Sequence, residues 1–406
     1  MSISRKTRAY VACTIAWVLA SSCDEGSADE GEFPLDDGPA YVVATRVWDD
    51  TSITSYFHVL PSLEAGTPVD PARALEVPGS AKLYAIDGTA WLAIGGGDTP
   101  TITRYELDEQ RALVARESIG LHAYGVSSLW DGLYVVSPTK VYYPDRDNQQ
   151  LIVINPTAMT IDGAVALPQT ARPGYLSLYG YTPVMRGDEL LFSVGWFDWD
   201  STDSILGETG LVVLDTITDT VVRVDVDTRC GGITQPVVTD TNEAWFVSSA
   251  LAAAAHRLER LPTAPCALRI AADADAFDPG VVVDLGTLTG GLLAGEPVPG
   301  GGSNIFLRVL DENLAQIDPE GATWQITGQA AWAWWRWNVQ TQEMVALPEL
   351  RPSTSDVLWF EVDGRVFGAD TPEDYSQTTL IELTAAGGPR PTLVAPGFLH
   401  AVARAR

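Results

Sequence analysis

The stretch LIVINPTAMTIDGAVAL, residues Leu151–Leu167, decides the fold class. An apolar strand leads to a tight turn opened by Asn155, and apolar and polar residues then alternate along a second strand. This pattern is typical of a β-hairpin at the edge of a sheet. A sibling stretch, LVVLDTITDTVVRVDV at Leu211–Val226, places Asp215 at the same point of the turn. The hairpin is therefore a repeated unit.

Other segments repeat parts of this unit. Looser hairpins are predicted over Thr101–Ile119 and Trp332–Leu350. Further segments share a polar turn followed by a strongly apolar strand: Asp131–Ser137, Asp188–Val194, Asn242–Ser248 and Asp363–Ala369. Helix-period patterns are almost absent, apart from a short Ala-rich insertion expected at Ala252–Leu261. Because one such unit cannot bury both faces, the units must pack side by side.

The repeat spacing predicts an all-β protein, a β-propeller of seven four-stranded blades. Equivalent strands recur about every 50–60 residues, which suits blades with long insertions. Six blades follow in sequence, over residues 79–119, 120–167, 174–227, 231–288, 290–350 and 354–397. The alternative is a six-bladed ring with an extra hairpin.

The two ends of the chain are predicted to share the seventh blade. The strands expected near the N-terminus are Tyr41–Val47, Ser55–Leu60 and Ala72–Val77, which lack an inner partner. Phe398–Arg404 is a lone strand at the C-terminus that can supply it. Pairing the two ends would close the ring and remove exposed sheet edges.

The N-terminal residues 1–22 have the layout of a signal peptide. Basic residues precede an apolar run over Tyr10–Ala20 that is too short for a lasting membrane span. The run ends in Leu-Ala-Ser-Ser-Cys, which resembles a lipobox and predicts Cys23 as a lipidated mature N-terminus. The alternative is an ordinary secretory peptide cleaved near the same place. We therefore expect an exported lipoprotein, periplasmic or associated with the outer membrane of a bacterium.

The remaining chain divides into a tether and one folded part. Residues 23–40 are acidic, contain glycine and have few bulky apolar side chains, so we expect a flexible tether. Residues 41–406 are predicted to form the single propeller domain. The chain has 53 acidic and 25 basic residues, with a net charge of −28. The negative electrostatic field of such a chain repels nucleic acid and is compatible with cationic ligands as partners. An acidic surface can also be an adaptation to salt.

The cysteine count predicts one disulfide. Of the four cysteines, Cys13 belongs to the signal peptide and Cys23 is the candidate anchor. The remaining pair, Cys230 and Cys266, indicates a disulfide in an exported protein, because a metal site would need further ligands nearby. Neither cysteine has a histidine within a few positions, so a catalytic thiol is not expected.

Several motifs resemble one known family. They are Tyr41–Val47, Thr54–Tyr56, Ser62–Thr67, Pro100–Tyr105, and the cysteine segments Arg229–Gly232 and Pro265–Ile270. Together they look like exported lipoproteins encoded beside siderophore synthesis and uptake genes of the myxochelin type. The resemblance implies a role in iron handling, with a siderophore or an outer-membrane uptake component as partner, and it supplies no catalytic residues. The turns at Asn155 and Asp215 are similar to surface-layer type propeller repeats, which indicate fold and not function.

One candidate ligand site is aromatic. In the segment WAWWRWN, strand alternation places Trp332, Trp334 and Arg336 on one face. Aromatic rings with an arginine could stack a planar ligand such as a catecholate. The competing interpretation, which we favour, is that bulky aromatics fill the space between blades.

Two further candidates are weaker. His122 and His400 occupy similar places just inside predicted inner strands, so they could meet in the channel, although packed structural histidines are the simpler interpretation. Asp198, Asp200 and Asp203 could hold calcium, but no glycine turn or closing glutamate follows, and a solvated acidic loop is favoured. No cofactor is required, and calcium or another divalent cation is the one candidate.

Two function classes fit these observations. The sequence has no nucleophile elbow, no phosphate-binding loop and no dinucleotide fingerprint after a strand. The favoured class is a non-catalytic binding or scaffold propeller. The alternative is a hydrolase or lactonase-like propeller with a metal in its channel, which requires acidic, Asn or His side chains converging at the starts of the inner strands.

Overall fold

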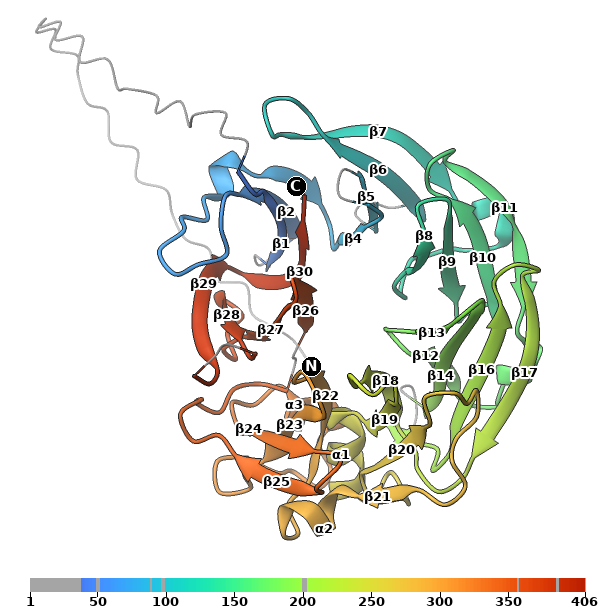
Figure 1. Cartoon of the computed structure of the whole chain (residues 1–406), viewed down its shortest axis with the longest axis vertical. Helices are drawn as coiled ribbons and strands as arrows, with labels where there is room; N and C mark the ends of the chain where they lie inside the picture. The colour runs from blue at the N-terminus through green and yellow to red at the C-terminus, as the bar shows by residue number, and fades with distance from the viewer. Residues whose placement is uncertain are drawn as a thin grey trace, which may run out of the picture. The chain divides into compact units, whose positions relative to one another are not determined.

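Thirty strands in the described residues form seven antiparallel sheets, arranged as blades around a central axis (Figure 1). The computed structural model describes residues 38–48, 52–87, 90–95, 99–198, 203–355, 358–384 and 387–405. These belong to one compact unit, Gly38–Arg406. Each blade has a path of four strands, and the count of seven confirms the prediction over the six-bladed alternative.

The first three blades are given from the innermost strand outward. Blade 1 consists of β30 (Phe398–Arg404), β1 (Tyr41–Trp48), β2 (Ile53–Leu60) and β3 (Leu75–Pro78). Blade 2 consists of β4 (Lys82–Ala85), β5 (Ala90–Ile94), β6 (Thr101–Leu107) and β7 (Leu113–Gly120). Blade 3 consists of β8 (Tyr134–Ser137), β9 (Lys140–Asp145), β10 (Gln150–Asn155) and β11 (Thr160–Ala166).

The other four blades complete the ring. Blade 4 has β12 (Leu176–Tyr179), β14 (Glu189–Asp198), β16 (Thr209–Asp215) and β17 (Thr220–Asp227), and the short strands β13 (Val184–Arg186) and β15 (Ser204–Ile205) also pair with β14. Blade 5 has β18 (Ile233–Val238), β19 (Ala244–Ser248), β20 (Cys266–Ile270) and β21 (Val282–Asp284). Blade 6 has β22 (Ala294–Pro299), β23 (Asn304–Leu310), β24 (Trp332–Asn338) and β25 (Glu343–Ala346). Blade 7 has β26 (Trp359–Val362), β27 (Arg365–Asp370), β28 (Gln377–Glu382) and β29 (Arg390–Pro396).

Short helices lie between the strands. Three are α-helices: α1 (Ala250–Arg257), α2 (Leu285–Thr289) and α3 (Thr323–Thr327). Three are single 3₁₀ turns: η1 (Pro71–Arg73), η2 (His122–Tyr124) and η3 (Pro168–Thr170). The expected Ala-rich helix is α1, which begins two residues earlier than predicted, with Ser249 as its N-cap.

The repeated hairpin turns have one cause. The Oδ1 of Asn155 accepts hydrogen bonds from the backbone N–H groups of the residues two and three positions later, at 3.1 and 2.9 Å. Asp215 and Asn338 do the same in their hairpins, at 2.8–2.9 Å and 3.0–3.1 Å. In each case the fourth residue after it has a positive φ, between 51° and 58°. A short polar side chain therefore fixes the turn from the third to the fourth strand.

The ring is closed by the two ends of the chain, as predicted. β30 pairs antiparallel with β1, from Tyr41 opposite Arg404 to Arg46 opposite Phe398. Each of the seven junctions between neighbouring blades holds its own buried apolar cluster in the described residues. The core is thus divided among the seven junctions, and in the described ranges each blade packs against both of its neighbours.

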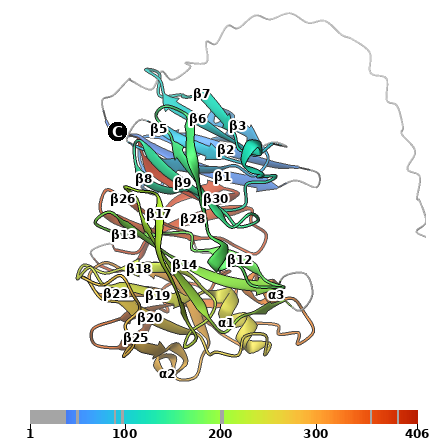
Figure 2. The same ribbon diagram turned by 90° about the vertical axis from the view of Figure 1, so that its right-hand side faces the viewer.

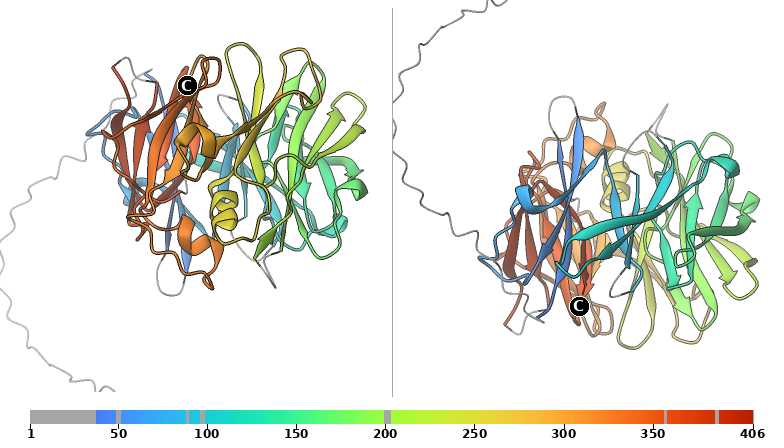
Figure 3. Two further views of the ribbon diagram at one scale, coloured as in Figure 1. Left: turned by 90° about the horizontal axis from the view of Figure 1, so that it is seen from below. Right: turned by 90° about the horizontal axis from the view of Figure 1, so that it is seen from above.

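The ring has two different faces. We call the face where the inner strands begin the upper face and the opposite one the lower face. β19 and β23 end beside the starts of β18 and β22, so the α1 and α3 connections that follow them lie on the upper face. Figures 2 and 3 show both helices opposite the C-terminus, which lies on the lower face. Because Tyr41 pairs with Arg404, the chain also begins β1 from the lower face.

One internal correspondence drawn from the sequence was wrong. Asp188–Val194, Asn242–Ser248 and Asp363–Ala369 contribute to the second strands β14, β19 and β27 of their blades. Asp131–Ser137 instead leads into β8, the innermost strand of blade 3. Both kinds of strand follow a polar turn and are apolar, so the local pattern does not distinguish them.

Candidate functional site

The disulfide is present. Cys230 and Cys266 are bonded, with Cα atoms 5.8 Å apart, and both lie in the apolar cluster between blades 4 and 5. Around them, the Ser248 hydroxyl donates to the Gly231 carbonyl at 3.0 Å and accepts from the Cys266 N–H at 3.1 Å. The crosslink therefore lies in a packed, hydrogen-bonded part of the core.

The aromatic segment lies mainly inside blade 6. Trp332 and Trp334 are fully buried, and only Arg336 is exposed. The Trp332 indole donates to the Ile326 carbonyl at 3.0 Å, and Trp334 packs between blades 6 and 7 beneath the guanidinium of Arg308. In this arrangement the two buried rings fill space between elements, and ligand binding at this segment stays a prediction.

The acidic segment at the end of β14 contributes a structural carboxylate. Asp203 forms an ion pair with Arg260 at 3.1 Å and also accepts from the backbone N–H and hydroxyl of Thr323. The adjacent guanidinium opposes binding of a cation at this carboxylate. Asp198 is the last residue of β14, and Asp200 lies outside the described residues, so the calcium site stays a prediction.

The two histidines lie in different kinds of segment. His122 is exposed in η2, outside any inner strand. His400 lies on the inner strand β30, and among the described groups its two ring nitrogens are buried without a hydrogen-bond partner. Burial is the main reason that its pKa falls to about 3, and the nearby charges of Arg46 and Lys82 lower it further. His400 is therefore a neutral imidazole beside two cations.

Bulges mark three inner strands near their starts. In β30, His400 is the extra residue between Leu399 and Ala401. β18 and β22 have register shifts at the corresponding level, at Thr234 and at Glu296. Glu296 also has a positive φ of 57°, which is unusual for a glutamate. Bulges of this kind redirect side chains and are frequent near functional sites, so they point to the upper end of the axis.

Cations gather at this upper end between blades 1, 2 and 3. Arg46 comes from the end of β1, Lys82 begins β4, and Arg146 directly follows β9. With Asp131 and His400 these residues form what we call the upper-face cluster. In a chain of net charge −28, three cations around one place stand out as a local positive field.

Lys82 and Arg146 both contact the segment that leads into blade 3. The Lys82 ammonium donates to the Trp130 carbonyl at 2.7 Å, and Arg146 lies 3.6 Å from the carboxylate of Asp131. Burial raises the pKa of Asp131 to about 6, and only part of this is offset by the nearby Arg146 and Lys82. The exposed Asp147 also faces Asp131 and raises its pKa. Near neutral pH the cluster thus keeps an excess of positive charge.

Exposed tryptophans flank the cluster. Trp130 is 56% exposed and Trp48 is 42% exposed, which is unusual for this residue. The guanidinium of Arg146 lies 5.6 Å from the centre of the Trp130 ring, and that of Arg46 lies 5.8 Å from the Trp48 ring. Cation and aromatic side chains are therefore paired at two points of the upper face.

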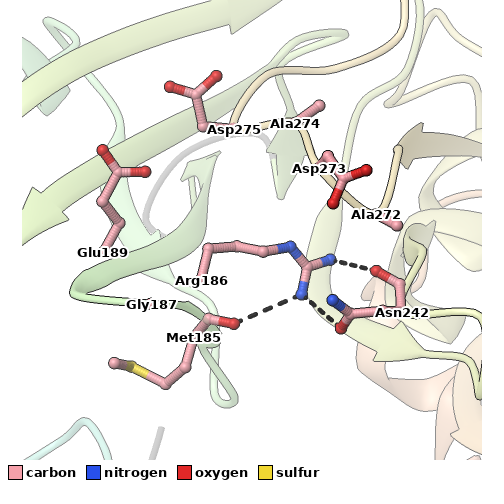
Figure 4. Close-up of a pocket in the computed structure, with 9 residues that line it drawn as sticks. All are labelled: Met185, Arg186, Gly187, Glu189, Asn242, Ala272, Asp273, Ala274 and Asp275. Carbon is pink, nitrogen blue, oxygen red and sulfur yellow. Dashed lines mark hydrogen bonds between the residues drawn. The ribbon is translucent and has the colours of Figure 1, made fainter.

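A separate pocket of about 460 Å³ lies near the β13–β14 turn (Figure 4). Its walls include the carboxylates of Glu189, Asp273 and Asp275, with Arg186 between them. The Arg186 guanidinium is already bonded to the Asn242 side chain at 3.0 Å and to the Asn242 carbonyl at 2.6 Å. The one cation of this pocket is therefore already engaged and its other charged groups are carboxylates, whereas the upper-face cluster combines cations with exposed tryptophans and is the stronger candidate.

Metal-ligating groups and membrane-spanning helices can both be assessed in the described residues. Among the residues that the structure describes, no group of three or more His, Cys, Asp and Glu side chains could hold a metal ion. A channel metal held by acidic and histidine side chains alone is thus not found in these ranges. Within the same ranges, no helix has the length and apolar character needed to cross a bilayer.

Sequence reasoning found His400 but missed the rest of the upper-face cluster. Arg46, Lys82, Asp131 and Arg146 are isolated in sequence and belong to no motif. A usable signal is the scarcity of lysine together with the place of Lys82 near the start of the blade predicted over residues 79–119. That signal is weak on its own.

Comparisons with known proteins agree with the fold. No protein-family model matches the sequence, and no curated protein matches it either. A Bacteroides fragilis structure described as a "putative 6-phosphogluconolactonase" has a TM-score of 0.53 and 8% identity, covering 91% of this chain and 98% of its own. Apo AztD from Citrobacter koseri has a TM-score of 0.45 and 11% identity, covering 90% of this chain and 98% of its own. Hydrazine synthase from Kuenenia stuttgartiensis has a TM-score of 0.47 and 10% identity, covering 78% of this chain and 79% of its own. The first likeness shows the propeller fold alone, and the other two are too distant to carry an argument.

Proposed function

We propose that this chain is an exported, lipid-anchored propeller that binds an anionic aromatic ligand of the siderophore class on its upper face, without catalysing a reaction. The observation that carries the proposal is the upper-face cluster. Three cations and two exposed tryptophans converge there from four separate segments of an otherwise acidic chain.

The chemistry of the cluster matches such a ligand. A ferric catecholate complex is an anion whose surface consists largely of aromatic rings. Guanidinium groups bind its oxygens through charge-assisted hydrogen bonds, and Trp48 and Trp130 offer faces for its rings. The Nε of Arg46 is buried and has no hydrogen-bond partner among the described groups, so a ligand oxygen would satisfy it.

The first strand of the ring begins away from the cluster. Because Tyr41 pairs with Arg404, β1 begins at the lower face and ends at the upper face beside the cluster. The sequence motifs that resemble siderophore-cluster lipoproteins support the same assignment.

Ligand binding is the first test. We expect the ferric complex of 2,3-dihydroxybenzoate to quench the tryptophan fluorescence of the purified protein in a saturable titration. Replacing both Arg46→Gln and Arg146→Gln should weaken binding by about 100-fold, because two charge-assisted contacts of roughly 1.5 kcal/mol each are lost.

The matched control is the pair Arg116→Gln and Arg390→Gln. It changes the net charge equally, and both residues are exposed on outer strands, where Arg116 pairs with Glu106 and Arg390 pairs with Glu64 and Glu382. These replacements should leave the affinity within about two-fold. Equal affinity of both double variants, or no saturable quenching of the wild type, would rule out the upper face as the binding site.

Lipid anchoring has its own test. Cys23 lies outside the described residues, so this part of the proposal depends on the sequence motif. In a bacterial host the wild type should partition with membranes, and Cys23→Ser should release the protein or leave its signal peptide uncleaved. A soluble wild type with an unmodified N-terminus would refute the anchor while leaving the ligand proposal intact.

A further inference from the structure

Lysine is scarce in this protein, and one lysine lies in the upper-face cluster. The chain has three lysines, Lys6, Lys82 and Lys140. Lys140 forms an ion pair with Asp219 at 2.9 Å and also donates to a backbone carbonyl. Lys82 has no ion pair of that kind among the described residues, and its ammonium donates to the Trp130 carbonyl. The two lysines of the described domain are thus held in different ways.

The groups that face Lys82 come from every neighbouring element. Arg46 approaches from β1 and Arg146 from the end of β9, and both oppose a positive charge on Lys82. Asp131, ahead of β8, favours that charge but is itself shared with Arg146. His400 on β30 is neutral at physiological pH and adds no negative charge.

The balance of these groups makes the ammonium of Lys82 easier to deprotonate than that of an ordinary lysine. Burial is the largest effect, and together with the two guanidinium groups it lowers the pKa of Lys82 to about 8, against the opposing effect of Asp131. About one tenth of the side chain is therefore unprotonated at pH 7, far more than for a lysine of ordinary pKa. A neutral amine can still donate one hydrogen to the Trp130 carbonyl, and its lone pair is then free to react.

We propose that Lys82 is a nucleophilic amine that captures anionic aldehydes or ketones on the upper face as a reversible imine. The amine nitrogen attacks the carbonyl carbon to give a carbinolamine. Water then leaves with the carbonyl oxygen and both amine hydrogens, and a carbon–nitrogen double bond remains. No oxidant or reductant takes part, and hydrolysis reverses the reaction.

The surroundings of Lys82 define the ligand class. Arg46 and Arg146 lie on two sides of the amine and would bind a phosphate or carboxylate of the ligand. Trp130, whose carbonyl accepts from Lys82, would cover an aromatic or planar part. The inference does not depend on the siderophore assignment.

Labelling with pyridoxal phosphate tests the proposal directly, because it is an anionic aromatic aldehyde. The purified protein is incubated with it, reduced with borohydride to fix any imine, and mapped by peptide mass spectrometry. At about pH 7.5 we expect Lys82 to be labelled at least about ten-fold faster than Lys140, with a rate that rises and levels off as pH passes about 8. Equal labelling, or faster labelling of Lys140, would overturn the proposal.

Two variants separate reactivity from anion binding. Lys82→Arg keeps the positive charge and should abolish labelling at this position without changing the labelling of Lys140. The double variant Arg46→Gln with Arg146→Gln should bring the Lys82 rate with pyridoxal phosphate close to that of Lys140, with circular dichroism confirming the fold. Unchanged selectivity in this double variant would show that the ligand class is wrong. Ferric-complex binding is measured without an aldehyde, so it can fail or succeed independently.

Discussion

Truncation after Gly397, which removes β30, is expected to destabilise the whole domain. β30 provides the inner strand of blade 1, and its Leu399 and Val402 pack in the junction with blade 7, while Ala401 packs in the junction with blade 2. Losing this burial costs roughly 5 kcal/mol, which is comparable to the total stability of many domains. Calorimetry should show one cooperative transition at a much lower Tm, and the exposed edge of β1 should promote aggregation.

Arg404→Gln is the control for this truncation. It keeps the strand and removes an exposed ion pair between Arg404 and Asp363, whose atoms are 2.6 Å apart. Such a surface pair contributes less than about 1 kcal/mol, so the Tm should hardly change. A truncated protein that melts like its parent would show that ring closure by the C-terminal strand does not stabilise the domain.

The fold could be predicted because its signals are local and repeated. Asn155 and Asp215 each form their turn through their own side chain, so the hairpin can be recognised in a short window of sequence. The closing strand was predicted at Phe398–Arg404, the same residues that form β30, because the blades between the ends left one inner strand missing. Repetition turns a weak pattern into a reliable one, because each copy is an independent instance of the same unit.

The site could not be predicted in the same way. Arg46 and Arg146 are about 100 residues apart in sequence and meet only when three blades pack together. The bulge that turns His400 inward depends on its pairing with β1, which no local pattern reveals. The dense aromatic segment that predicts a candidate site holds two buried tryptophans, Trp332 and Trp334, and clustered tryptophans on a strand mainly indicate a well-filled core.

Removing the disulfide, with Cys230→Ala and Cys266→Ala together, is expected to lower the free energy of unfolding by about 4 kcal/mol. The bond closes a loop across 36 positions of sequence and so restricts the unfolded chain. The replacements also remove buried sulfur atoms from the cluster between blades 4 and 5, which adds a smaller loss. Urea unfolding followed by tryptophan fluorescence should show an earlier midpoint, and Tm should fall by roughly 5–10 °C.

The folded structure of this variant should persist, because other contacts hold the same two segments. Ser248 still links the Gly231 carbonyl to the backbone N–H at position 266, so the circular dichroism spectrum should match that of the wild type. A reductant should move the wild-type midpoint towards that of the variant and leave the variant unchanged. If the oxidised wild type and the variant unfold at the same urea concentration, the crosslink adds nothing, and packing and hydrogen bonds alone stabilise the junction between blades 4 and 5.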